Sequence, residues 1–212
     1  MIKHYPASPE LPQNFSTDFY LEDEASIEAV HSSELDYSYL TCENLMIRRS
    51  ILEKITMQRT KLVRFEASNV LFKNCDFSNL EWIGGSFHQV AFENCKLTGC
   101  NFAESYLRDC CFTDCLINFG SFSATNLKNV AFENCQLKDS EFFELTWKHL
   151  FLVNNELTNS NWQRTRLASL DFTTNQFSKI AFSMEQLNGL KVDSYQALVI
   201  AAGLGLQIQD EK

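Results

Sequence analysis

The sequence predicts an all-β fold of stacked coils, closed by one short helix at its C-terminal end. Two observations carry this prediction: a large apolar residue recurs at every fifth position, and a longer phrase recurs at every twentieth. A third is that the 212 residues include only 7 Gly and 3 Pro but 18 Phe, which argues against a disordered or collagen-like chain. A chain of this length can bury a sizeable core within one domain.

The five-residue period runs without interruption from Phe72 to Leu187. All 24 of its positions are large and apolar, and all three Trp are among them. Mostly small residues, such as Cys95 and Ser140, stand two positions before them. Residues two apart on an extended chain share a face. Each group of five residues therefore turns one small and one large residue inward, while its other three residues face solvent. Neither a helix bundle nor an ordinary sheet has this period.

The twenty-residue period predicts a coil with four sides. The phrases FKNC, FENC, FTDC and FENC begin at Phe72, Phe92, Phe112 and Phe132, and LVNN and FTTN continue them in weaker form. Because four fives make twenty, each Phe is expected to stack over the Phe one turn earlier, beside a ladder of Cys side chains. The six residues VAFENC occur at 90–95 and again at 130–135, and their Glu faces outward in this register.

This repeat resembles the pentapeptide repeat family, whose consensus five reads A(D/N)LXX. The resemblance covers roughly 150 of the 212 residues and implies a right-handed quadrilateral β-helix. The register continues back through Ile47 and weakens before residues 35–42. We therefore divide the chain into an N-terminal cap or flap (1–34), a pentapeptide-repeat solenoid (35–192), and a C-terminal capping or dimerisation helix with its tail (193–212).

The C-terminal helix is predicted from the segment VDSYQALVIAAGLGLQI. Asp193 is suited to cap it, Gln196 stands in the capping-box position, and Gly203 or Gly205 ends it. The segment is more apolar than a solvated terminal helix needs, so it either folds onto the last coil or forms a dimer interface. The phrase KVDSYQA is similar to the C-terminal segment of the Qnr-like quinolone-resistance proteins, and this resemblance favours a homodimer. The expected interface residues are Leu190, Val192, Tyr195, Ala197, Leu198, Ile200, Ala201 and Leu204.

Composition and charge restrict the classes of partner. The formal net charge is −9, which argues against direct binding of nucleic acid, because phosphate contacts need a basic surface. The longest apolar run, at 197–206, is too short to span a bilayer, and the first residues lack the features of a signal peptide. Eight Cys without a secretory signal indicate reduced thiols, so we expect a cytoplasmic protein without a membrane partner.

The sequence offers no catalytic, cofactor or metal site. Six of the eight Cys stand at small inward positions, Cys42 stands at a large inward position, and Cys111 faces outward. No Cys-x-x-Cys occurs, and neither a Gly-rich phosphate loop nor a nucleophile–base pair can be identified. Buried structural thiols explain the cysteines better than a metal site, and an enzyme is not expected.

Outward charges separate by side in the predicted register. Between residues 67 and 184, two opposite sides each carry a net charge of −3, and the side around Leu107 and Leu127 carries +3. Ordinary solubility patterning explains any single charge, but the segregation by side is harder to explain in this way. The acidic sides are the candidate partner surface. Their residues are Glu93, Asp114, Glu133 and Asp171 on one side and Glu81, Glu104, Glu141 and Glu144 on the other.

Qnr-like proteins bind the type II topoisomerases DNA gyrase and topoisomerase IV by imitating the bound DNA segment. The resemblance therefore implies a DNA mimic that inhibits or modulates one of these enzymes, with quinolone protection as a further expectation. Several Qnr proteins need loops between repeats for protection, and the unbroken register here leaves no room for them. The chain thus looks most like the loopless, chromosomally encoded Qnr-like proteins. The alternative is a solenoid adaptor that binds an unrelated protein.

Overall fold

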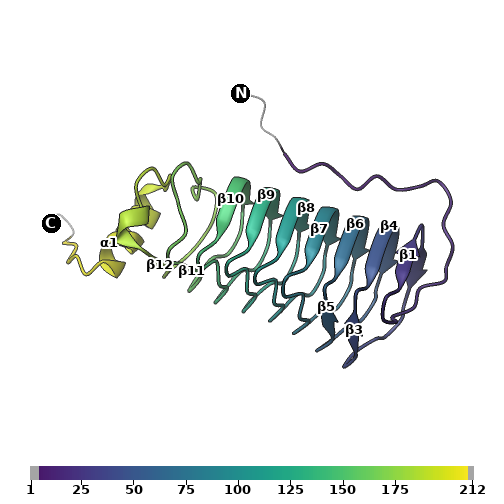
Figure 1. The fold of residues 1–212 in the computed structure, drawn as a ribbon. Helices are drawn as coiled ribbons and strands as arrows, with labels where there is room; N and C mark the ends of the chain where they lie inside the picture. Colours follow the sequence, from purple (N-terminus) through teal and green to yellow (C-terminus); the bar gives the residue numbers. More distant parts are fainter. Residues whose placement is uncertain (1–4, 210–212) are drawn as a thin grey trace.

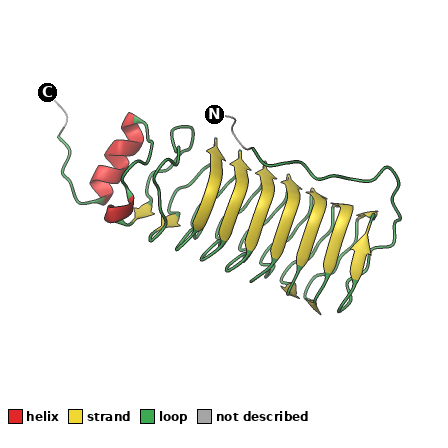
Figure 2. Cartoon of the chain, turned by 45° about the horizontal axis from the view of Figure 1, so that its top comes forward, coloured by secondary structure: helices red, strands yellow, loops and turns green. Residues whose placement is uncertain are grey.

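The computed structural model describes residues 5–209, which form an elongated parallel β-solenoid with a helix at one end (Figure 1). One eight-stranded sheet runs along the rod, and Figure 2 shows its strands stacked side by side. Its strands are β1 (Ser26–Glu28), β2 (His31–Ser33), β4 (Met46–Glu53), β6 (Glu66–Lys73), β7 (Ser86–Glu93), β8 (Tyr106–Thr113), β9 (Asn126–Glu133) and β10 (Thr146–Val153). The remaining elements are β3 (Thr41–Glu43), β5 (Lys61–Val63), β11 (Asn161–Trp162), β12 (Ala181–Phe182), the 3-10 helix η1 (Met184–Gln186) and the helix α1 (Ser194–Gly203).

Strand pairing confirms the twenty-residue coil. Phe92 of β7 pairs with Phe112 of β8, and Phe112 pairs with Phe132 of β9, always in parallel and always twenty residues apart. The same spacing holds from β1 and β4 to the short pair β11 and β12. The predicted all-β coil with a short C-terminal helix is therefore the observed fold.

The corners of the coil come from left-handed backbone. Every fifth residue from Glu24 to Ser169 has a φ between 49° and 77°, which turns the chain once per five residues and four times per coil. Asn is the commonest residue at these corners, and Asn enters the left-handed region more readily than most side chains do. The Asn of FENC is thus a corner residue, as Asn94 and Asn134 show.

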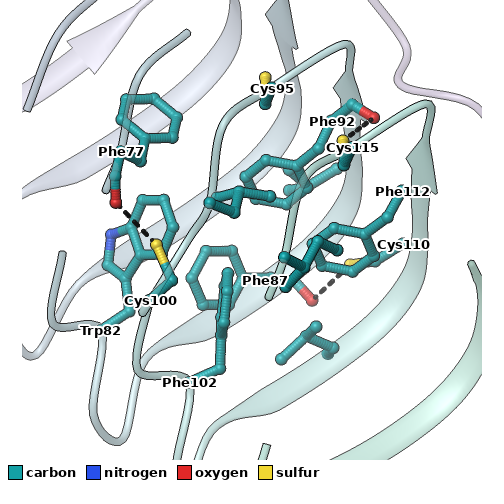
Figure 3. Close-up of a cluster of buried hydrophobic side chains, with 14 of the residues drawn as sticks. Phe77, Trp82, Phe87, Phe92, Cys95, Cys100, Phe102, Cys110, Phe112 and Cys115 are labelled. Carbon is teal, nitrogen blue, oxygen red and sulfur yellow. Dashed lines mark hydrogen bonds between the residues drawn. The ribbon is translucent and has the colours of Figure 1, made fainter. Parts of the chain in front are cut away.

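The core consists of the inward residues of the five-residue period. All of them from Phe72 to Leu187 are buried except Trp147, Phe182 and Leu187, which are half-buried. Trp147 tilts toward the surface, where its indole nitrogen donates to the backbone oxygen of Arg166 at 2.6 Å. Aromatic rings stack along the rod, with centroids of Phe92 and Phe112 4.6 Å apart and nearly parallel (Figure 3).

Small inward residues donate hydrogen bonds to the previous coil. The thiol of Cys115 donates to the backbone oxygen of Phe92 at 3.4 Å, and that of Cys100 donates to the backbone oxygen of Phe77 at 2.8 Å (Figure 3). The hydroxyl of Ser105 donates to the backbone oxygen of Trp82 in the same way. Cys, Ser and Thr suit this position because each is small and carries one donor.

The coils begin earlier than the boundary expected at residue 35. Both β1 and β2 pair with β4, so the solenoid already includes Ser26. The register is weak there in sequence because Ser32 occupies an inward position that holds Phe or Leu in later coils. Ahead of β1, the chain runs back along the outside of the rod from the β1 end toward β10 (Figures 1 and 2).

The C-terminal helix closes the rod. Asp193 caps α1, and the reciprocal bonds between Asp193 and Gln196 form the predicted capping box. Gln196 is buried, and its side-chain amide donates to the backbone oxygens of Phe172 and Asn175 at 2.7 and 2.6 Å. These bonds satisfy carbonyls of the last coil that have no following coil to pair with. Within residues 5–209, no helix is long and apolar enough to cross a membrane.

Candidate interaction surfaces

The solenoid presents four walls, which we name by one inward residue each: the Phe92, Leu97, Phe102 and Leu107 walls. Each long strand from β6 to β10 bends at a corner, so its first half lies on the Leu107 wall and its second half on the Phe92 wall. Isolated bridges between single residues build the Leu97 wall and, together with the short pairs β3–β5 and β11–β12, the Phe102 wall. Residues ten apart lie on opposite walls, which places the two acidic groups on opposite faces.

On the Phe92 wall, the acidic residues differ in exposure. Glu93 and Asp114 are exposed, and Asp171 is exposed at the C-terminal end, where it accepts hydrogen bonds from Thr173. Glu133 is half-buried because the hydroxyl of Tyr5 donates to its carboxylate. Burial raises the pKa of Tyr5, and the nearby Glu133 carboxylate raises it further.

On the Phe102 wall, most acidic residues already have partners. Glu81 lies 3.6 Å from the amine of Lys61, and Glu144 lies 2.7 Å from the guanidinium of Arg164. Glu141 accepts a hydrogen bond from the side chain of Asn161 at 2.7 Å. Glu104 is exposed at a coil corner.

Three of the eight predicted acidic residues therefore remain open to a partner. Glu93, Glu104 and Asp114 make no ion pair within residues 5–209. They lie on consecutive coils, two on one wall and one on the opposite wall. An exposed carboxylate without a local cation is available to pair with basic groups of another molecule.

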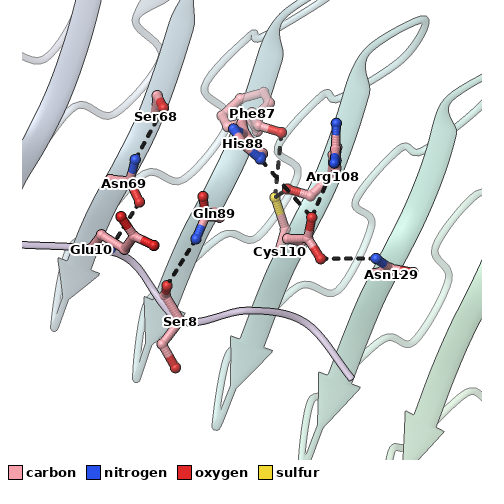
Figure 4. A network of polar contacts seen from close by, with 11 residues as sticks. Ser8, Glu10, Ser68, Asn69, Phe87, His88, Gln89, Arg108, Cys110 and Asn129 are labelled. Atoms are coloured by element: carbon pink, nitrogen blue, oxygen red, sulfur yellow. Dashed lines mark hydrogen bonds and ion pairs between the residues drawn. The ribbon is translucent and has the colours of Figure 1, made fainter. Parts of the chain in front are cut away.

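The Leu107 wall is basic, with Arg108, Lys128, Lys148 and Arg166 all exposed. Its acidic side chain Asp109 is buried and accepts a hydrogen bond from Asn129 at 2.9 Å. Arg108 lies 3.3 Å from the Asp109 carboxylate, in the network of Figure 4. A cavity of about 570 Å³ opens beside Lys148, Arg164 and Arg166.

The N-terminal segment is a surface feature that the sequence analysis missed. Residues 5–12, which we call the strap, lie across the Phe92 wall. The ring centroids of Tyr5 and Phe151 are 5.3 Å apart, the side chain of Gln89 donates to the backbone oxygen of Ser8, and the backbone nitrogen of Glu10 donates to Asn69 (Figure 4). The sequence held a signal for this contact, because the outward residue before the inward Phe or Leu is apolar in each coil from Leu71 to Phe151.

The predicted dimer residues divide into two groups. Tyr195, Ala197, Leu198 and Leu204 are exposed, with exposed fractions of 64% for Tyr195 and 50% for Leu198. The other four are half-buried, and three of them pack against the core: Leu190, Val192 and Ile200. Ala201 is half-buried as well. The C-terminal end therefore both caps the last coil and exposes apolar side chains.

Burial keeps several interior thiols protonated. Burial raises the pKa of Cys100 and raises that of Cys110 to about 12. Among residues 5–209 no cluster of three or more His, Cys, Asp or Glu side chains is arranged to hold a metal ion.

Comparison with known proteins finds a family match for part of the repeat. Residues 85–162 match the family described as a pentapeptide repeat region. A trypsin-treated variant of QnrB1, a plasmid-mediated fluoroquinolone resistance protein, is 15% identical, with 89% of this chain and 97% of that chain covered and a TM-score of 0.45. HetL from the cyanobacterium Nostoc sp. strain PCC 7120, a pentapeptide repeat protein involved in heterocyst differentiation regulation, is 10% identical, with 80% and 84% covered and a TM-score of 0.42. No curated protein sequence matches the chain.

Proposed function

Because the chain carries a pentapeptide repeat solenoid, we propose that it is a non-catalytic cytoplasmic protein that binds a type II topoisomerase, DNA gyrase or topoisomerase IV, in place of a DNA segment. Three features support the proposal: the similarity of KVDSYQA to the Qnr-like ending, the acidic walls, and the uninterrupted rod. About eight coils at ~4.8 Å each give a rod of roughly 38 Å, about the length of one helical turn of DNA.

The observation that carries the proposal is the set of three open carboxylates, Glu93, Glu104 and Asp114. A DNA duplex has one charge per ~1.7 Å, or roughly 20 over the length of this rod. The net charge of the chain is −9, so its charge density is well below that of DNA. Binding must therefore depend on a few carboxylates at defined places rather than on a uniform acidic surface.

The uninterrupted corners from Glu24 to Ser169 bear on the outcome of binding. No loop leaves the coils in this part of the rod, so no long segment is available to reach a drug bound in a cleavage complex. We therefore expect inhibition of the topoisomerase to be stronger than protection against quinolones.

A supercoiling assay with purified gyrase tests the proposal. The wild-type chain should inhibit supercoiling, and Glu93→Lys should raise the concentration needed for inhibition about tenfold, because a reversed charge faces the basic groove of the enzyme. Glu66→Lys is the matched control, since Glu66 is also an exposed strand-end residue but lies on the basic Leu107 wall. If excess wild-type protein changes neither supercoiling nor quinolone-stabilised cleavage, with topoisomerase IV tested in parallel, the proposal fails.

We further propose that two copies associate through the C-terminal end, which would give a longer rod. The exposed side chains of Tyr195, Leu198 and Leu204 support this, because they leave apolar surface at one end of the molecule. Sedimentation should give the mass of two chains, and Leu198→Glu should give that of one chain. Leu116→Glu is the control, because Leu116 is 46% exposed but lies on the side of the rod. A single-chain mass for the wild type would remove this proposal.

A further inference from the structure

An apolar stripe runs along the outside of the Phe92 wall. It consists of the outward residue just before the inward Phe or Leu in five successive coils: Leu71, Ala91, Cys111, Ala131 and Phe151. Strand pairing sets these residues directly beside one another. The inward side chains already fill the core, so the fold itself does not require apolar residues at these outward positions.

The strap covers this stripe. Its Tyr5 ring contacts Phe151 at one end, and its Glu10 backbone bonds Asn69, beside Leu71, at the other. Residues from both the strap and the stripe line a cavity of about 320 Å³ between them, including Pro9, Ala91 and Cys111. The stripe is thus an apolar surface with an observed occupant.

The strap contains all three prolines of the chain, at positions 6, 9 and 12. A polyproline II helix repeats every three residues, so this spacing puts the three rings on one face, and each residue before a proline is biased to the same extended backbone. All three prolines and Leu11 are half-buried, whereas Ala7, Ser8 and Glu10 are exposed. The proline face is therefore the face turned toward the wall.

The repeat lengths of the strap and the wall agree. Three residues of polyproline II advance ~9.3 Å, and two coils advance ~9.6 Å. The observed contacts agree with these lengths. Glu10 bonds Asn69 at the corner of β6, and Tyr5 bonds Glu133 of β9, three coils further along. Five residues of such a helix span ~15.5 Å, against ~14.4 Å for three coils. A wall with this spacing suits a peptide with proline at every third residue.

Side-chain contacts, and not a backbone ladder, hold the strap to the coils. Its backbone makes no backbone–backbone hydrogen bond with the coils in the described part of the chain, where the first such bond joins Ser16 to Ala29. Ser16 also accepts from the backbone nitrogen of His31, which anchors the segment at that point. Release of residues 5–12 would therefore uncover the stripe without opening a coil.

We propose that the apolar stripe is a binding groove for an extended segment of a partner protein, in which an aromatic residue precedes prolines spaced three apart. The strap is the internal ligand of this groove and competes with the partner segment. The inference does not rest on the proposed topoisomerase activity, because it concerns a different ligand and its test needs no topoisomerase.

Cys111 provides a direct measure of an open groove. It lies in the middle of the stripe and is half-buried, whereas the other seven cysteines are buried. A thiol reagent added to the folded protein should therefore modify one residue, at a rate set by how often the strap leaves. Protection of the other seven thiols shows in the same experiment that the solenoid is folded.

The first measurement compares labelling rates of full-length proteins. Tyr5→Ala removes the ring contact with Phe151 and the bond to Glu133, and should speed the labelling of Cys111 about tenfold. Pro9→Ala should have a smaller effect in the same direction. Tyr20→Ala should leave the rate unchanged, since Tyr20 has an exposed fraction of 43%, similar to the 46% of Tyr5, but lies outside the strap. Equal rates for wild type and Tyr5→Ala would overturn the proposal.

The second measurement supplies the ligand in trans. A synthetic peptide of residues 5–12, added at millimolar concentration to the Tyr5→Ala protein, should slow Cys111 labelling at least fivefold. The same peptide with its three prolines replaced by Ala should not. If neither peptide protects Cys111, or both protect it equally, the groove does not recognise proline spacing and the proposal is wrong.

Discussion

The central coils and the last coil share one inward pattern but differ in packing. In the centre, Phe92 and Phe112 stack with an interplanar angle of 1°, and Phe102 and Phe122 stack at 4°. Across the interior, the central rings of Phe92 and Phe102 meet edge to face at 88°, whereas the rings of Phe172 and Phe182, which are also ten residues apart, are tilted by 44°. Each central ring has a coil on both sides, whereas the last coil has one on a single side only.

This difference shows that burial in a solenoid depends on neighbouring coils as well as on sequence pattern. The five-residue period continues to Leu187, but left-handed corners at every fifth residue stop at Ser169. Phe182 and Leu187 are half-buried, although they occupy the same positions in the pattern as fully buried residues. Helix α1 replaces the missing coil, and Gln196 supplies the donors that a further strand would have supplied.

Alkaline pH should destabilise the centre most. All eight cysteines lie between residues 42 and 135, and burial raises the pKa of Cys110 to about 12. A thiol in the unfolded chain loses its proton above about pH 8.5, whereas the folded protein keeps it, so the unfolded state binds fewer protons. The free energy of unfolding should then fall by about 1.4 kcal/mol per pH unit for each thiol whose pKa is raised by burial, from that pH up to the pKa of the folded thiol. Several thiols together make this the largest expected effect.

Urea unfolding at pH 7.5 and pH 10 measures this loss. The double variant Cys100→Ser, Cys110→Ser should lose less stability between the two pH values, because two titrating groups are gone. Ser at these positions keeps a donor, as Ser105 does in the native coil. An equal loss in wild type and double variant would contradict the assignment of the pH dependence to buried thiols.

The next largest effect is expected from truncating an aromatic ring, which should lower the free energy of unfolding more in the central coils than in the last coil. Phe112→Ala should lower the free energy of unfolding by about 3–5 kcal/mol, because stacked coils on both sides prevent the cavity from collapsing. Phe182→Ala should cost about 1 kcal/mol, since that ring is half-buried and has fewer neighbours to lose. Denaturant unfolding of both variants gives the comparison. Similar losses would show that the last coil is packed as tightly as the centre.

Much of the fold could be predicted from the sequence because each inward position repeats a simple requirement. The register, the core and the capping box of Asp193 and Gln196 all follow from spacing. The first coils were harder to recognise, because Ser32 and Tyr37 stand where later coils carry Phe or Leu. The path of the strap was not predicted, because an extended segment has no periodic partner in sequence, although its proline spacing and the apolar stripe were both present.

In the candidate site too, contacts that follow the repeat could be predicted from the sequence, whereas contacts with the strap could not. The register assigns each acidic residue to a wall, and ion pairs between adjacent coils, such as Arg164 with Glu144, follow from the twenty-residue spacing. The bond from Tyr5 to Glu133 joins residues 128 positions apart and could not be read from any period. Local repetition thus predicts which side chains share a face, but not which of them a distant segment covers.

Gln196→Ala should produce the smallest of the three effects and should confine it to the last coil. The substitution removes the donor to the backbone oxygen of Asn175, one of the donors to that of Phe172, and half of the capping box, which together should cost about 1–3 kcal/mol. Because the central coils keep both neighbours, hydrogen exchange should speed up between residues 170 and 196 and stay unchanged around Phe112. Gln207→Ala is the control, since Gln207 is exposed beyond the helix. Faster exchange throughout the rod would mean that the two ends and the centre unfold as one unit. The central and last coils would then differ in how their rings pack, but not in local stability.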